Sequence, residues 1–89
     1  METIRLEFTK RFLREFDSVK KYNERMRKKI SQFIKEICKD PLRGTGKIER
    51  LTETRFSHRV DQKNRLIYDF FPETHTIRIL CCLGHYDDR

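Results

Sequence analysis

The amino-acid sequence predicts an α+β fold, in which two N-terminal helices pack on a mainly antiparallel sheet of four to five strands. Apolar residues recur at helical spacing in the first half of the chain, whereas the second half holds short strand-like runs separated by polar turns. A chain of 89 residues can bury one small core and little more. We therefore expect a single domain over residues 1–89.

The first element should be a short strand, because apolar and charged residues alternate over residues 4–8. Thr9 can then cap a helix with its side-chain oxygen. A polar break at residues 20–23 should separate two amphipathic helices, whose apolar positions are Phe12, Leu13, Phe16 and Val19, then Met26, Ile30, Phe33, Ile34 and Ile37. Asp40 should end the second helix, since a residue before proline is disfavoured in helical geometry.

The second half of the chain carries the strands of the expected sheet. Gly44 and Gly46 predict a turn before a short strand-like run at residues 47–51. Three longer strands follow in the sequence, at residues 56–61, 65–71 and 76–85, with polar turns at residues 62–64 and 72–75.

The alternation of apolar residues in the first hairpin predicts how its two arginines lie. Paired positions of neighbouring strands point the same way, so Phe56 and Val60 join the apolar face of Leu66 only if the turn has an odd number of residues. That register pairs Arg59 with Arg65. If the apolar face lies under the helices, both arginines project from the open face, where they could grip a phosphate.

The charge of the chain favours a polyanionic partner. Lys and Arg number 21 against 14 Asp and Glu, which gives a formal net charge of +7. One dense basic cluster lies between and within the helices and comprises Lys20, Lys21, Arg25, Arg27, Lys28 and Lys29. It could be the solvated side of a helix, but only Glu24 balances it, so we expect Lys20, Lys21, Arg25, Lys28 and Lys29 to contact a nucleic acid.

Other features exclude several classes of protein. No apolar stretch approaches the length of about 18 residues that spans a bilayer, and the N-terminus lacks the apolar stretch of a signal peptide. We therefore expect a cytoplasmic protein without a membrane partner. Cys38, Cys81 and Cys82 are odd in number and lack the spacing of a zinc site, so they are expected to be reduced packing residues.

Four motifs in the second half carry a resemblance to a known family. They are residues 44–51 (GTGKIERL), residues 56–60 (FSHRV), residues 65–68 (RLIY) and His85-Tyr86. In this order they resemble the successive motifs of the YoeB/Txe toxins, within the RelE-like superfamily. The resemblance implies a RelE-like fold and a ribosome-dependent mRNA endonuclease that acts on mRNA in the ribosomal A site. It also implies the toxin half of a toxin–antitoxin pair, neutralised by a cognate acidic antitoxin.

The resemblance assigns roles to individual residues. Glu49 takes the place of the general base, Arg65 that of the phosphate-stabilising arginine and His85 that of the general acid. Arg59 matches a second phosphate-contacting position, and Tyr86 matches the aromatic residue that helps to position the substrate.

These residue types suit the cleavage of RNA without a metal ion or another cofactor. A neighbouring 2′-hydroxyl can attack the phosphodiester if a base removes its proton, an acid protonates the departing 5′-oxygen and cations stabilise the phosphorane. Glu49, His85 and the arginines could supply all three functions, and the product would be a 2′,3′-cyclic phosphate. Lys47 and Arg50, which flank Glu49, are expected to help bind the substrate.

Two other functions are compatible with the same residues. The chain could be a non-catalytic nucleic-acid-binding module, or chiefly a protein that binds an acidic antitoxin segment. A carboxylate among cations weakens a pure phosphate binder but serves a transesterase, so Glu49 favours catalysis. Glu49 could also be a solvated partner of neighbouring lysines, although the ordered motifs favour the catalytic role. Whether the chain is a monomer or a homodimer stays open.

Overall fold

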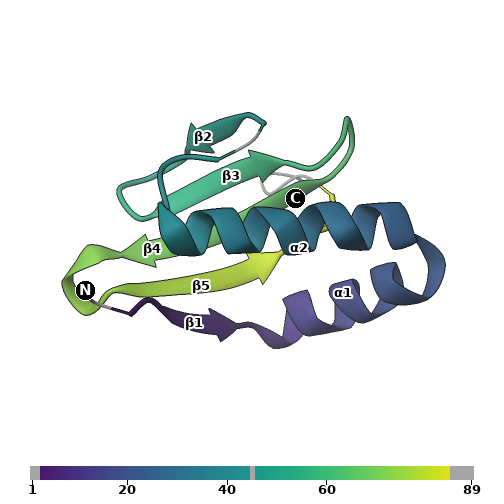
Figure 1. Cartoon of the computed structure of the whole chain (residues 1–89), viewed down its shortest axis with the longest axis horizontal. Coiled ribbons are helices and arrows are strands. Elements are labelled where there is room, and N and C mark those ends of the chain that lie inside the picture. Colours follow the sequence, from purple (N-terminus) through teal and green to yellow (C-terminus); the bar gives the residue numbers. More distant parts are fainter. Residues whose placement is uncertain (1–2, 45, 85–89) are drawn as a thin grey trace.

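The computed structural model describes residues 3–44 and 46–84. Two helices lie against a five-stranded mixed sheet, which confirms the predicted α+β class (Figure 1). The elements in chain order are β1 (Arg5–Phe8), α1 (Lys10–Tyr22), α2 (Glu24–Lys39), β2 (Ile48–Arg50), β3 (Arg55–Arg59), β4 (Arg65–Phe71), a single 3-10 turn η1 (Pro72–Thr74) and β5 (Thr76–Cys81).

The sheet has the strand order β1-β5-β4-β3-β2. Strands β2 to β5 pair antiparallel with their neighbours, whereas β1 pairs parallel with β5. The first described strand, β1, thus lies beside the last one, β5, although both helices separate β1 from the other strands in the sequence (Figure 1). β2 and β1 form the two edges.

Side-chain caps define the helix boundaries. Thr9 Oγ1 accepts a hydrogen bond from the Phe12 amide at 3.0 Å and thereby caps α1 as predicted. Asn23 separates the helices, since its amide donates to Val19 O at 2.8 Å while its Oδ1 accepts from the Met26 amide at 3.1 Å. The predicted break at residues 20–23 was therefore too long. Residues 20–22 remain helical, because lysine and tyrosine tolerate a helix and only Asn23 leaves helical geometry.

β4 spans residues 65–71 as predicted, whereas the other strands in the second half lie close to their predicted places but are shorter. β3 ends at Arg59 instead of residue 61, and β5 ends at Cys81 instead of residue 85. The register of β4 with β5 shifts between Ile67 and Tyr68, which marks a β-bulge near the end of this pairing. Residues 82–84 follow β5 and take no part in the pairing of β5 with β4.

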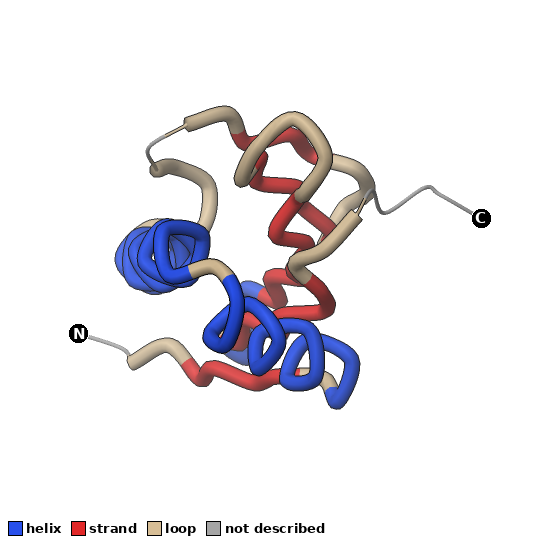
Figure 2. Tube along the Cα trace, turned by 90° about the vertical axis from the view of Figure 1, so that its right-hand side faces the viewer, coloured by secondary structure: helices blue, strands red, loops and turns tan. Residues whose placement is uncertain are grey.

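The helices cover one face of the sheet and form the core with it (Figure 2). The fully buried side chains of this core include Ile30, Ile37, Val60, Leu66, Tyr68, Ile77, Ile79 and Cys82. The Tyr68 hydroxyl donates to Pro41 O at 2.6 Å, which ties the loop after α2 to the middle of the sheet. None of the helices in the described ranges is both long enough and apolar enough to cross a membrane.

The cysteines behave as packing residues. Cys81 and Cys82 are buried, Cys38 is half-buried, and all three are free thiols. Burial, with a smaller contribution from the Glu15 carboxylate, raises the pKa of Cys82 to about 12. A thiol with such a pKa is protonated at neutral pH and therefore a poor nucleophile.

Candidate active site

The first hairpin brings the two predicted arginines together. Arg59 pairs with Arg65 across β3 and β4, as the apolar pattern predicted. In the same register Phe56 pairs with Tyr68, and both are buried against the helices. The arginines occupy the alternate positions, so they project from the opposite face of the sheet.

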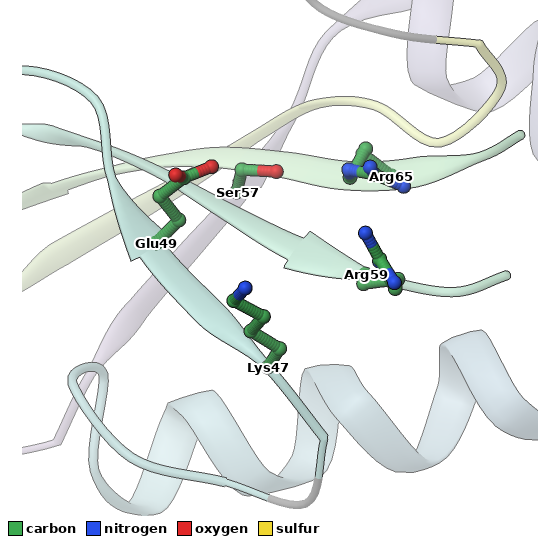
Figure 3. A pocket seen from close by; sticks show the side chains of 5 residues that line it. All are labelled: Lys47, Glu49, Ser57, Arg59 and Arg65. Carbon is green, nitrogen blue, oxygen red and sulfur yellow. The ribbon is translucent and has the colours of Figure 1, made fainter. Parts of the chain in front are cut away.

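The pairing of β2 with β3 adds the carboxylate to this face. Glu49 lies opposite Ser57, and Ser57 is two residues before Arg59 on the same strand. All three side chains therefore point to one side of the sheet. Figure 3 shows that Lys47 and Arg65 converge on the same space from the chain before β2 and from the start of β4.

Five side chains line the resulting pocket, which has a volume of about 120 Å³: Lys47, Glu49, Ser57, Arg59 and Arg65. A hollow of this size has room for a phosphate group. The wall carries three cations and one carboxylate. The net positive charge of these groups attracts a phosphate, and the Glu49 carboxylate lies beside it as a possible proton acceptor.

The backbone holds the cationic wall in place. Lys47 O accepts a hydrogen bond from the Arg59 amide at 3.0 Å, so the residue before β2 is fixed to the end of β3. Arg65 Nη1 donates to the carbonyl oxygen of Asp61 at 3.1 Å and to that of Asn64 at 3.5 Å. The guanidinium of Arg65 is thus oriented by the turn between β3 and β4, and among residues 3–44 and 46–84 its other nitrogens have no hydrogen-bond partner.

Ser57 was not singled out from the sequence, although it belongs to one of the four motifs. Its side chain lies between Glu49 and Arg65 in the view of Figure 3, and the residue is only 5% exposed. The signal was present in the period of a strand, because a residue two positions before Arg59 shares its face. A hydroxyl here can donate to a phosphate oxygen or accept from an arginine.

Arg50 lies elsewhere. It pairs with Phe56, and its guanidinium lies 5.5 Å from the centre of that aromatic ring. The guanidinium also donates to the carbonyl oxygens of Thr52 at 3.1 Å and Glu53 at 2.8 Å. Because neighbours along a strand point to opposite faces, Glu49 in the pocket places Arg50 on the other side, and the structure does not bring it to the predicted substrate site.

His85 and Tyr86 lie outside the described residues. The described chain reaches Gly84, whose carbonyl oxygen accepts a hydrogen bond from the Arg65 amide at 3.2 Å. The residue that precedes His85 in the sequence is therefore adjacent to the strand that carries Arg65.

Another, larger hollow of about 430 Å³ shares two lining residues, Lys47 and Arg59, with the pocket. Lys29 and Phe33 of α2 also line it. A further hollow of about 300 Å³ contains Lys29 together with Arg25. Basic side chains therefore follow one another from α2 to the pocket.

The cluster is not uniformly available to a partner. Arg27 forms an ion pair with Glu24 at 2.6 Å, and Lys20 lies 3.9 Å from Asp17. Lys21, Arg25 and Lys28 show no ion pair within the described part of the chain. In the same part of the chain, no three His, Cys, Asp or Glu side chains gather closely enough to hold a metal ion.

The family model that matches the chain describes a YoeB-like toxin of bacterial type II toxin–antitoxin systems, and the match spans residues 8–86. The chain belongs to this family. In this YoeB-like toxin, all five residues that line the pocket lie within the region that the family model matches.

Solved structures of YoeB and RelE proteins are similar to this YoeB-like toxin. The YoeB dimer from Staphylococcus aureus is 26% identical with a TM-score of 0.82, and the YoeB–YefM complex from the same organism is 27% identical with a TM-score of 0.79. Each comparison covers 96% of this chain and 100% of the other. The archaeal RelE–RelB complex from Pyrococcus horikoshii OT3 is 17% identical, covers 98% of this chain and 100% of the other, and has a TM-score of 0.77. It shows the shared RelE-like fold. A comparison with curated proteins finds no match.

Proposed function

We propose that this toxin is a ribosome-dependent endoribonuclease that cleaves mRNA by acid–base transesterification. The observation that carries the proposal is the pocket that unites Glu49 with Arg59 and Arg65 on one face of the sheet. A carboxylate beside two guanidiniums, in a space that can hold a phosphate, suits the attack of a hydroxyl on a phosphodiester.

The proposed reaction needs one base, one acid and a cationic cradle. Glu49 removes the proton of the 2′-hydroxyl, whose oxygen then attacks the adjacent phosphorus. Arg59 and Arg65 stabilise the charge that develops on the phosphorane, because each planar guanidinium can hold two oxygens. His85 protonates the departing 5′-oxygen, so the products are a 2′,3′-cyclic phosphate and a 5′-hydroxyl. Lys47 adds a positive charge at the opposite wall.

The hollow beside α2 supports a role for the ribosome in presenting the substrate. It shares Lys47 and Arg59 with the pocket and is also lined by Lys29. We propose that mRNA in the ribosomal A site occupies the pocket while ribosomal RNA contacts the cluster of Lys20, Lys21, Arg25, Lys28 and Lys29. Contacts to phosphates release counterions, so binding should weaken steeply as salt is raised.

Reversing two charges of α2 tests this docking. The double variant Lys28→Glu, Lys29→Glu should lower the affinity for ribosomes at least tenfold and reduce the slope of log affinity against log salt by about two. Sedimentation with ribosomes over a range of salt concentrations measures both. The matched variant Lys35→Glu, Lys39→Glu changes the same charge on a later part of the helix and should bind nearly as wild type. Equal binding by both variants would remove the cluster from the interface.

An acidic antitoxin is the proposed protein partner. The S. aureus and P. horikoshii relatives were solved as complexes with YefM and RelB. The net charge of +7 on this chain suits a partner of opposite charge.

Expression in a bacterial host tests the catalytic proposal. The wild-type protein should stop growth and leave transcripts with 2′,3′-cyclic phosphate ends. The variants Glu49→Ala, Arg65→Ala and His85→Ala should relieve growth arrest and transcript cleavage, yet still bind the antitoxin. Growth arrest by all three variants without cut transcripts would instead identify a binding protein that acts without catalysis.

A further inference from the structure

We propose that Asn64 and Glu15 are positioning residues that hold the segment from which His85 extends. The inference rests on the proposed function, in which His85 supplies the acid. It assigns a role to two side chains outside the pocket, one in the turn between β3 and β4 and one on α1.

Asn64 joins the turn to the C-terminal segment. Its Nδ2 donates to both carboxylate oxygens of Asp61 at 3.1 Å, and its Oδ1 accepts from the Gly84 amide at 2.8 Å. The chemistry fixes this amide orientation, because a carboxylate can only accept and a backbone N–H can only donate. A flipped amide would lose both contacts.

Asp61 anchors this contact through further hydrogen bonds. One of its carboxylate oxygens also accepts from the backbone amides of Lys63 and Asn64, each at 2.8 Å. Burial acts to raise the pKa of Asp61, but the hydrogen bonds from Asn64 and Lys63 outweigh it and lower the pKa overall. The carboxylate therefore stays ionised at neutral pH and continues to accept from Asn64.

The same turn orients Arg65. The Arg65 guanidinium donates to Asp61 O at 3.1 Å, and its amide donates to Gly84 O at 3.2 Å. Gly84 is thus held from both sides, by the side chain of Asn64 and by the backbone of Arg65. The turn between β3 and β4 therefore sets the position of Arg65, which is proposed to bind the phosphate, relative to Gly84, which precedes His85.

Glu15 holds the two residues before Gly84. Its Oε1 accepts from the Cys82 amide at 2.7 Å and from the Leu83 amide at 3.1 Å, while Arg11 Nε donates to Oε2 at 2.9 Å. Three successive amides after β5 therefore bind side chains. Gly84 itself has φ +78°, a left-handed conformation that suits glycine.

The hydrogen bonds of Glu15 and Asn64 form a clamp that holds residues 82–84, which directly precede His85 in the sequence. An acid that must meet a departing oxygen works only within a narrow range of positions, and a displacement of about 1 Å can cost a hundredfold in rate. Loss of these hydrogen bonds should therefore lower the rate at which bound mRNA is cleaved more than the affinity of the protein for mRNA.

Kinetics of Asn64→Ala with ribosome-bound mRNA test the proposal. We expect kcat to fall about tenfold to a hundredfold with KM within twofold of wild type. In a protein that already carries His85→Ala, the same change should have no further effect. Ser18→Ala, at an exposed position of α1 that lines neither the pocket nor the two larger hollows, should behave as wild type. An equal loss with and without His85 would show that Asn64 acts on Arg65 or on the fold in general, and would overturn its role in positioning His85.

Amide hydrogen exchange tests the anchor independently of cleavage. The Gly84 amide should be protected in the wild-type protein and exchange at least tenfold faster in Asn64→Ala. Glu15→Ala should likewise expose the Cys82 and Leu83 amides, which provides a second variant if the first unfolds. Unchanged protection in folded variants would contradict the clamp. A wild-type protein that cleaves no RNA would refute the proposed function, while exchange would still decide whether Asn64 holds Gly84.

Discussion

Replacing Glu49 with Gln is expected to slow the cleavage of ribosome-bound mRNA about a thousandfold. The amide keeps the shape of the side chain, so the strand pairing of Glu49 with Ser57 should persist. It cannot take the proton of the 2′-hydroxyl, and the attacking oxygen must then lose that proton to solvent. The loss should lie in kcat, as measured by single-turnover cleavage at saturating toxin.

The affinity of the same variant for a phosphate should not fall. The pocket of the Glu49→Gln variant retains Lys47, Arg59 and Arg65 but has lost its carboxylate, so a phosphate should bind as tightly as before or more tightly. The control is Glu53→Gln, which makes the same chemical change in the exposed loop after β2. Equal cleavage by both variants would remove Glu49 from the reaction.

Replacing Asp69 with Asn is expected to lower the free energy of unfolding by about 3 kcal/mol. Arg55 Nε and Nη2 donate to the two carboxylate oxygens of Asp69 at 2.8 and 2.9 Å. Asp69 is 4% exposed, so its charge is stabilised almost entirely by protein groups. The Asn variant keeps one acceptor but leaves the Arg55 charge without its buried counter-charge.

The size of this change makes it easy to measure. For a domain of this length, about 3 kcal/mol corresponds to a fall of roughly 12–24 °C in Tm. The matched control is Glu7→Gln, which breaks the ion pair of Glu7 with Arg78 at 3.0 Å in the same sheet. Both partners of that pair are more than a third exposed, so less than about 1 kcal/mol should be lost. Similar losses in the two variants would show that burial does not strengthen the Arg55–Asp69 pair.

The pairing of the two arginines is the part of the site that local pattern could predict. Apolar residues that alternate on both strands of a hairpin admit only one register that buries them together, and this register places Arg59 opposite Arg65. The cap at Thr9 was predictable for a similar reason, since the contact joins residues only three positions apart.

Other parts of the site needed contacts that no local pattern encodes. β2 has only three residues, too few for alternation to show its partner or its face, and its pairing with β3 decides that Glu49 enters the pocket while Arg50 does not. The parallel pairing of β1 with β5 likewise joins opposite ends of the chain.

By itself, the sequence determined the fold class, the order of most elements, the arginine pair and the resemblance to YoeB toxins. These depend on periodic patterns and ordered motifs that neighbouring residues carry. Only the tertiary structure decided that Ser57 joins the pocket, that Arg50 turns away and that Asn64 and Glu15 hold residues 82–84. Hydrogen bonds between residues 20 to 68 positions apart leave no periodic trace, because their partners meet only when the sheet and the helices have packed.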